Sequence, residues 1–388
     1  MITNFTISRK FYPVLFLLLI NCIFFFDIYF GQQSFFFGDN LLHVVPNMIF
    51  WKSMVFQGEI PLWNPYIFAG LPQLANPATN TLSPLNLPFL IITNPFQALS
   101  ITAALEIFLT SVFMFLLTKN YIKFLPARLA ASIIFTYSGT TLAAINDLNS
   151  LQGIIFIPLV LITLEHLRKS PSIKLSIILS IILSLQFISG HPQYHYLTWL
   201  LVIFFVFTQT KQSIKSKTLT LITTLIFFVG LSAVQLFPFL ELTRHTYRPS
   251  SVSFSSQNSL EFFDLPRLVI AHIYGSWNQG NSWGPHSPME VGRANSEGYL
   301  GFFTLILVLI NLKQKHPRKI FYLTIAIVSF LIALGPSTPI HQIFRLLLPG
   351  FKLFRSPMRF LAFYSFASSI LVGMTIEKLS IKQKHPDV

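Results

Sequence analysis

Residues 11–30 read FYPVLFLLLINCIFFFDIYF and are almost entirely apolar. A helix needs about 20 such residues to cross the hydrocarbon core of a bilayer. Arg9 and Lys10 precede the run, and no small-residue cleavage site interrupts it. We therefore interpret it as an uncleaved signal anchor that forms the first membrane span.

The rest of the chain has the same character. Of its 388 residues, 53% are hydrophobic and 10% are charged, whereas soluble proteins carry about 25% charged residues. The mean hydropathy of +0.62 excludes an ordinary water-soluble domain. The apolar runs are continuous and lack the strict alternation of a membrane β-barrel. This pattern predicts an all-α integral membrane protein. The lone Cys22 permits no intrachain disulfide.

The apolar runs predict about ten transmembrane helices in a single polytopic domain, 1–388. Several runs are shorter than a full span, so we expect the neighbouring residues to continue as helix. The predicted spans are residues 11–30, 98–118, 129–144, 151–165, 174–188, 196–210, 219–238, 299–312, 320–335 and 359–376.

The positive charges predict the orientation. Most of the 27 lysines and arginines fall in the termini and in the short loops on one side of these spans. Because short cytoplasmic loops retain positive charge, both termini are predicted to be cytoplasmic in a plasma membrane. The same bias explains the net charge of +14. A nucleic-acid partner is not expected, because no basic face with interleaved aromatic residues appears.

The opposite side carries three long segments, 31–97, 239–298 and 336–358, predicted to be extracytoplasmic loops. The first is too rich in apolar and aromatic residues for disorder, and long ordered loops are usually functional. We therefore expect a large, folded, helical first outer loop. The basic residues on this side are mostly arginines, whose planar fork suits phosphate and carboxylate groups.

Asp39 opens the apolar part of the first loop, just beyond the first span. A partly desolvated carboxylate there could act as a general base. It could equally cap the helix that the run Leu41–Phe56 predicts. The residues alone leave both roles open.

Arg355 and Arg359 flank Pro357 at the mouth of the last span. Pro favours a helix start, and the positive helix end together with two arginines would attract phosphate. Interfacial snorkelling of the arginines is the alternative. A second charged cluster follows the seventh span and comprises Glu241, Arg244 and Arg248.

His191 and His195 lie four residues apart in a polar outer turn. A metal site is disfavoured because Pro192 separates them and no third ligand is evident. Hydrogen bonding to a polar substrate, or a structural turn, fits better. Phosphate-binding loops, dinucleotide fingerprints and nucleophile elbows are absent from the sequence, so an ATP-driven pump is not expected.

The chain resembles the YfhO-type bacterial membrane proteins, which belong with the GT-C class of glycosyltransferases. Motifs along almost the whole chain carry the resemblance, most specifically those of the first loop. They are Gly38-Asp39, Gly58-Glu59-Ile60-Pro61-Leu62-Trp63-Asn64-Pro65-Tyr66, Gly70-Leu71-Pro72, Ser83-Pro84-Leu85-Asn86, Gly190-His191-Pro192-Gln193, Phe237-Pro238-Phe239-Leu240-Glu241, Gly298-Tyr299-Leu300-Gly301 and Phe354-Arg355-Ser356-Pro357-Met358-Arg359-Phe360. Relatives are often longer, so the chain could be a short form or a fragment.

The resemblance implies a GT-C-like fold and a sugar donor linked to polyprenyl phosphate. It implies transfer to a cell-envelope acceptor on the outer face of the bacterial plasma membrane, with inversion and with Asp39 as base. The residues expected to bind the lipid-linked substrate are Arg355, Arg359, Arg244, Arg248, His191, Trp63, Tyr66 and Glu241. No nucleotide is required, and a divalent cation held by Asp39 stays open. The rival interpretations are a transporter or flippase of lipid-linked saccharides and a non-catalytic scaffold.

Overall fold

The computed structural model describes residues 11–31, 33–36, 38–275, 281, 283 and 298–384. Arg9, Lys10 and most of 276–297 in the predicted second outer loop lie outside this range. Within it the chain is helical, and the backbone pairing of Asn64 with Leu71 is an isolated bridge that belongs to no strand.

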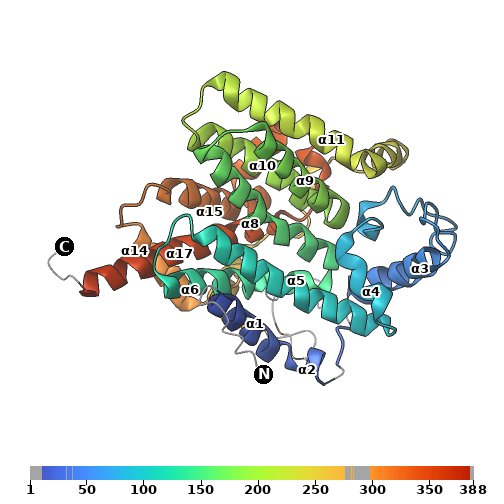
Figure 1. Ribbon diagram of the computed structural model, residues 1–388, viewed down its shortest axis with the longest axis horizontal. Helices are drawn as coiled ribbons and strands as arrows, with labels where there is room; N and C mark the ends of the chain where they lie inside the picture. Colours follow the sequence, from blue (N-terminus) through green and yellow to red (C-terminus); the bar gives the residue numbers. More distant parts are fainter. Residues whose placement is uncertain are drawn as a thin grey trace, which may run out of the picture.

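Each predicted apolar run overlaps a helix of 10 or more residues (Figure 1). These helices are α1 (Tyr12–Phe24), α5 (Pro95–Thr118), α6 (Leu125–Thr136), α8 (Leu148–Lys169), α9 (Ile173–Ser189), α10 (Pro192–Gln209), α11 (Ile214–His245), α14 (Phe302–Asn311), α15 (Lys319–Ala333) and α17 (Leu361–Lys384).

In the described residues, four helical segments are long and apolar enough to cross a membrane: α5, α8, α11 and the segment Pro357–Ile381. α6 and the segment Gly139–Asn146 form a bent pair, which is a fifth candidate span if the two count as one. The helices α1, α9, α14 and α15 are apolar but shorter. The chain is thus a helical membrane protein by composition and helix length, whereas the number of ten spans stays a prediction.

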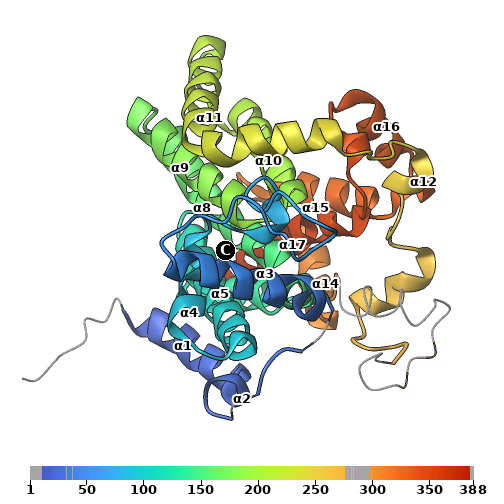
Figure 2. The ribbon, with the colours of Figure 1, turned by 90° about the vertical axis from the view of Figure 1, so that its right-hand side faces the viewer.

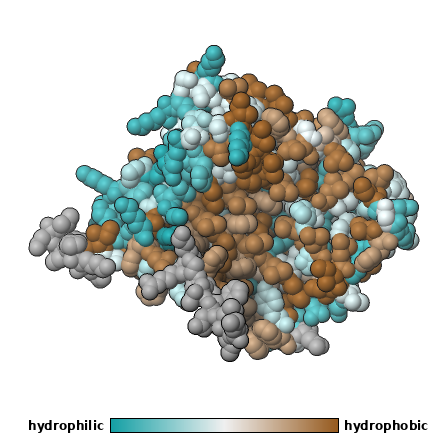
Figure 3. All heavy atoms as spheres, in the orientation of Figure 1, coloured by the Kyte–Doolittle hydropathy of each residue, from teal (hydrophilic) through white to brown (hydrophobic). Residues whose placement is uncertain are grey.

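The bundle has two distinct ends. α8 and α10 begin at one end, next to Asp147 and His191, and finish at the other, next to Arg168 and Gln209. We name the first the loop end, because the segment 31–97 packs there, and the second the basic end. Figure 2 views the bundle from the loop end, with α3 (Val45–Phe56) in front. The space-filling view shows a broad hydrophobic band between hydrophilic areas (Figure 3).

Two glycines bring α8 and the turn before α10 into close contact. A Cβ on Gly190 would lie 2.7 Å from the Cα of Gly153, and a Cβ on Gly153 would lie 2.8 Å from Tyr194. With glycine at both positions, the His191 amide donates a hydrogen bond to the Asn149 carbonyl at 2.9 Å. This contact fixes the start of α10 against the start of α8.

The segment 31–97 is tied together by its own polar side chains. It contains the π-helical turn Asn40–Val44, α3 and the short helix α4 (Leu87–Ile91). The indole of Trp51 donates to the Thr81 carbonyl at 2.8 Å, and the amide of Asn86 donates to the Asn80 carbonyl at 2.7 Å. The segment is thus a packed element, and its position outside the membrane stays a prediction.

A chain of buried polar groups connects this segment to the bundle. The amide of Asn80 donates to Gln152 at 2.6 Å, and the Gln152 amide donates to the carboxyl group of Glu106 in α5 at 2.7 Å. All three side chains are buried. The second carboxyl oxygen of Glu106 has no partner among the described residues. Within that part of the chain, the bond from Gln152 is therefore the hydrogen bond that the Glu106 carboxyl group accepts.

Gln152→Leu should therefore destabilise the fold. It would leave the polar groups of Asn80 and Glu106 without partners, and each buried unsatisfied group costs about 1–3 kcal/mol. Thermal unfolding in detergent, followed by circular dichroism, should show a midpoint several degrees lower. Ser184→Ala is the matched control, because Ser184 is buried and its hydroxyl has no partner in the described residues. Equal midpoints for Gln152→Leu and wild type would contradict a stabilising role for the hydrogen bonds that join Asn80, Gln152 and Glu106.

Candidate functional site

Asp39 lies at the loop end, exposed to solvent, directly before the π-helical turn Asn40–Val44. Its side chain makes no capping hydrogen bond, so the capping role that the sequence allowed is not observed. Its position is fixed by its neighbour, because the amide of Asn40 donates to the Ile145 carbonyl at 2.7 Å. That contact places Asp39 beside the loop before α8.

Asp147 is a second carboxyl group at this place, directly before α8. It accepts a hydrogen bond from the Ser150 hydroxyl at 2.7 Å. Burial raises the pKa of Asp147 above its ordinary value, and the nearby Asp39 carboxylate acts in the same direction, whereas Arg359 and His43 oppose the rise. Asp147 thus lies within electrostatic range of both an acidic and a basic residue of the predicted site.

The turn before α17 holds Arg359. Its guanidinium donates to the Gln193 side-chain oxygen at 3.0 Å, and the amide of Gln193 donates to the Ser356 carbonyl at 3.3 Å. Ser356 has a positive φ of 62°, and Asn258 donates to its hydroxyl at 3.0 Å. Arg359 is therefore held in position by residues from α10 and from its own turn.

His191 lies directly before α10 and contacts α8, because its backbone amide donates to the Asn149 carbonyl. Its Nδ1 accepts a hydrogen bond from the Gln193 backbone amide at 3.1 Å and so caps α10. Burial lowers the pKa of His191 well below 6.5, and Arg359, Arg248 and Arg355 lower it further. His191 is therefore a neutral imidazole at physiological pH.

Arg248 and Arg355 complete a cluster of three arginines. The Nε of Arg248 donates to the Leu353 carbonyl at 2.5 Å, and its guanidinium lies 5.2 Å from the Phe254 ring centre. Burial lowers the pKa of Arg248, and Arg355 and Arg359 add to this effect. Three like charges that influence one another favour an anion between them. We name Arg248, Arg355 and Arg359 the arginine cluster.

The other predicted site residues lie apart from these contacts. Trp63 and Tyr66 are 54% and 83% exposed on the segment 31–97. The Tyr66 ring packs against Phe50 at 5.9 Å between ring centres. Glu241 and Arg244 are exposed near the end of α11. Among the described residues, Asp39 and Arg359 share Asp147 as a neighbour, and the three arginines share His191. No hydrogen bond, ion pair or ring contact between described residues joins Trp63, Tyr66, Glu241 or Arg244 to them.

Sequence reasoning missed Asp147 and did not assign a role to Gln193. The predicted spans put residues 145–150 on the outer side, so a count of outer acidic residues would have pointed to Asp147. Gln193 is part of the motif Gly190-His191-Pro192-Gln193, but only the fold reveals that its amide joins Arg359 to Ser356.

The described residues contain no group of three or more His, Cys, Asp and Glu that could hold a metal ion. Asp39 and Asp147 offer two carboxylates, and metal sites built from carboxylates usually add further oxygen ligands. Among the described residues, these two carboxylates are the acidic groups near the predicted site, and metal dependence stays a prediction.

The neutral state of His191 predicts a pH effect on stability. Because its pKa in the folded chain lies below 6.5, the unfolded chain binds this proton more tightly. The stabilisation is therefore present above pH 6.5 and is lost as the pH falls below it. His191→Asn keeps an N-cap acceptor and removes the titration. The thermal midpoint of wild type should fall by about 2–4 °C more than that of His191→Asn between pH 7 and pH 5.

The exposed His245 supplies the control for this experiment. His245→Asn should follow the pH curve of wild type. Parallel curves for wild type and His191→Asn would show that His191 does not bind a proton more tightly in the unfolded chain.

Comparison with solved structures gives one distant match. No protein-family model matches the chain, and no curated protein matches it. A solved structure of the archaeal oligosaccharyltransferase AglB from Archaeoglobus fulgidus, in complex with an inhibitory peptide and a dolichol-phosphate, is similar at 11% sequence identity and a TM-score of 0.46. The match covers 97% of this chain and 51% of that one, so the chain spans about half the length of that protein.

Proposed function

We propose that the chain is a membrane glycosyltransferase. It would transfer a sugar from a polyprenyl-phosphate donor to a cell-envelope acceptor on the outer face of a bacterial plasma membrane. The observation that carries the proposal is the meeting of two carboxyl groups and three arginines at one end of an apolar helical bundle. Asp147 is the shared neighbour, since both Asp39 and Arg359 shift its pKa.

The arginine cluster suits the phosphate of the donor. The polyprenyl tail would lie in the bilayer along the apolar helices, which places the phosphate at the membrane–water boundary. Arginine binds phosphate through paired N–H groups, and such charge-assisted hydrogen bonds are about twice as strong as neutral ones. Arg359 is held by Gln193, so part of its orientation is set before the donor binds.

The reaction is a single displacement. The acceptor hydroxyl oxygen forms a bond to the anomeric carbon while the bond from that carbon to the phosphate oxygen breaks. The electron pair leaves with the phosphate, whose growing negative charge the arginine cluster stabilises. The acceptor proton passes to Asp39 as general base. Attack from the side opposite to the phosphate inverts the anomeric configuration.

Asp147 has a supporting part in this scheme. Burial and the nearby Asp39 carboxylate raise its pKa, and a proton taken up by Asp147 would lessen the repulsion between the carboxylates and an incoming phosphate. Because the Nδ1 of the neutral His191 accepts from Gln193, its Nε2 carries the proton and would donate a hydrogen bond to a sugar hydroxyl without adding charge.

The deciding experiment uses the full chain in proteoliposomes with a polyprenyl-phosphate sugar labelled in the sugar. Fragments of the cell envelope from a strain that lacks the protein serve as the acceptor. Wild type should move label into the envelope polymer and release polyprenyl phosphate. Movement of the intact lipid across the bilayer without release of polyprenyl phosphate would establish the transporter instead.

A further inference from the structure

The basic end contains a cavity of about 490 Å³. It lies between the ends of four elements: the loop after α5 with Tyr121, the end of α8 with Arg168, the residues after α10 with Lys211, and the turn before α15 with Arg318. Ligand pockets usually measure about 300–1,000 Å³. The cavity is thus large enough for a small molecule or a lipid headgroup. α8 has 22 residues, which separates it from the loop end by roughly 33 Å.

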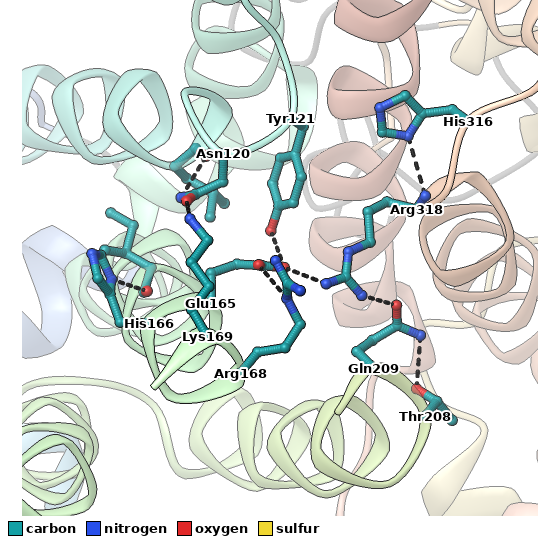
Figure 4. Close-up of polar contacts among 12 residues, drawn as sticks. Asn120, Tyr121, Glu165, His166, Arg168, Lys169, Thr208, Gln209, His316 and Arg318 are labelled. Carbon is teal, nitrogen blue, oxygen red and sulfur yellow. Dashed lines mark hydrogen bonds and ion pairs between the residues drawn. The ribbon is translucent and has the colours of Figure 1, made fainter. Parts of the chain in front are cut away.

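A single buried carboxylate organises the cationic side chains. Glu165 has a 1% exposed side chain and accepts a hydrogen bond from the Nε of Arg168 at 2.8 Å. The guanidinium of Arg318 lies 3.5 Å from its other oxygen, to which the Tyr121 hydroxyl also donates at 3.1 Å. Figure 4 shows these three side chains converging on Glu165. Arg318 also donates to the Gln209 side chain, so both guanidiniums are fixed in place.

The cavity nevertheless keeps an excess of positive charge. Arg168, Arg318 and Lys211 line it, and Glu165 can neutralise one of the three. The nearby acid Glu377 is engaged elsewhere, because it accepts hydrogen bonds from the backbone amides of Lys123 and Phe124. Arg168 is 31% exposed, and its terminal nitrogens make no hydrogen bond to other described residues. They remain available to a ligand.

We propose that this cavity is a second binding site, for a group with two negative charges on phosphate. The chemistry fits a phosphate monoester, a diphosphate or the headgroup of an anionic lipid with two phosphates. Arginines held by a carboxylate present their free edges to a phosphate in fixed geometry. Basic pockets between helix ends at the membrane surface bind such headgroups. The site is independent of the sugar-transfer proposal, because it shares no residue with the loop end.

The test measures binding to the purified full chain with two probes. Native mass spectrometry compares the binding of cardiolipin with that of phosphatidylcholine and tests for a lipid ligand. The shift in thermal midpoint on addition of inorganic pyrophosphate tests for a soluble phosphate ligand. The main variant is Lys211→Gln, because Lys211 is exposed and forms no hydrogen bond or ion pair with another described residue. Lys215→Gln removes a charge of the same kind, exposed at the same end but outside the cavity.

We expect Lys211→Gln to weaken binding about tenfold, as loss of a charged hydrogen bond implies, and Lys215→Gln to change it less than twofold. Arg168→Gln should weaken binding further. Cardiolipin binding alone would identify a lipid site, and stabilisation by pyrophosphate would identify a soluble phosphate ligand. The proposal fails if wild type binds neither probe, or if Lys211→Gln and Lys215→Gln have the same effect.

Discussion

Asp39→Asn is expected to lower the rate of sugar transfer by about 10²–10⁴-fold, the usual contribution of a general base. Asn has the shape of Asp but cannot take the proton from the acceptor hydroxyl. The fold should be retained, because the Asp39 side chain is exposed and caps no helix. The measurement is transfer of labelled sugar from a polyprenyl-phosphate donor into cell-envelope polymer, with the variant and wild type at equal amounts in the membrane.

Two variants control this experiment. Glu59→Gln removes another exposed carboxylate from the same segment and should leave the rate unchanged. Asp147→Asn tests the neighbouring acid, whose pKa burial raises and whose hydrogen bond from Ser150 an Asn side-chain oxygen can still accept. Its effect should therefore be well below that of Asp39→Asn. A full rate with Asp39→Asn, together with a collapse for Asp147→Asn, would transfer the role of base to Asp147.

Arg359→Gln is expected to have the second large effect, a loss of about 10²–10³-fold in transfer rate, similar to removal of one donor from a preorganised oxyanion site. It should also weaken binding of polyprenyl phosphate, the leaving group, because Gln cannot offer a charged pair of N–H groups. Asp39→Asn should leave that binding unchanged or make it tighter, since it removes a negative charge near the phosphate.

Binding of polyprenyl phosphate needs no acceptor, so it separates the role of the arginine from the role of the base. Lys352→Gln is the matched control, an exposed cation in the same connection before α17. If Arg359→Gln and Lys352→Gln weaken binding equally, the arginine cluster acts only through general surface charge.

Much of the fold could be predicted from composition. Continuous apolar runs have few alternatives to helices, because every backbone polar group in a membrane must be satisfied within its own segment. The prediction of a helix start at Pro357 was also useful: a 3-10 turn begins there and leads into α17. Helix lengths were less accurate. α11 runs from Ile214 to His245, beyond the predicted span 219–238 at both ends.

The candidate site could be predicted only in part. The distribution of positive charge predicts that Asp39, His191, Arg248, Arg355 and Arg359 lie on one side of the membrane. In the structure Asp39 and Arg359 share Asp147 as a neighbour, and the three arginines share His191. Sequence patterns act over a few residues. They could not reveal that Asn40 binds the carbonyl of Ile145, a contact between residues 105 positions apart that brings Asp39 near Asp147.

The cavity at the basic end was missed for the same reason. From the sequence alone, its lysines and arginines are explained by the positive charge that short cytoplasmic loops retain. Packing of α8 and α10 joins Arg168 and Gln209, and the turn before α15 adds Arg318. Glu165 was the signal available in the sequence, because it is an acid at the end of a predicted span. Acids in such positions are usually paired with a basic residue, so Glu165 could have pointed to the nearby arginines.

The central claim is that Asp39 and Arg359 act on one bound donor in one step. The most direct test compares the transfer rates of Asp39→Asn, Arg359→Gln and the double variant in the same membranes. Residues that act as a unit are strongly non-additive, so the double variant should be scarcely slower than the slower single variant. A double variant whose loss equals the product of the two single losses would contradict a shared site.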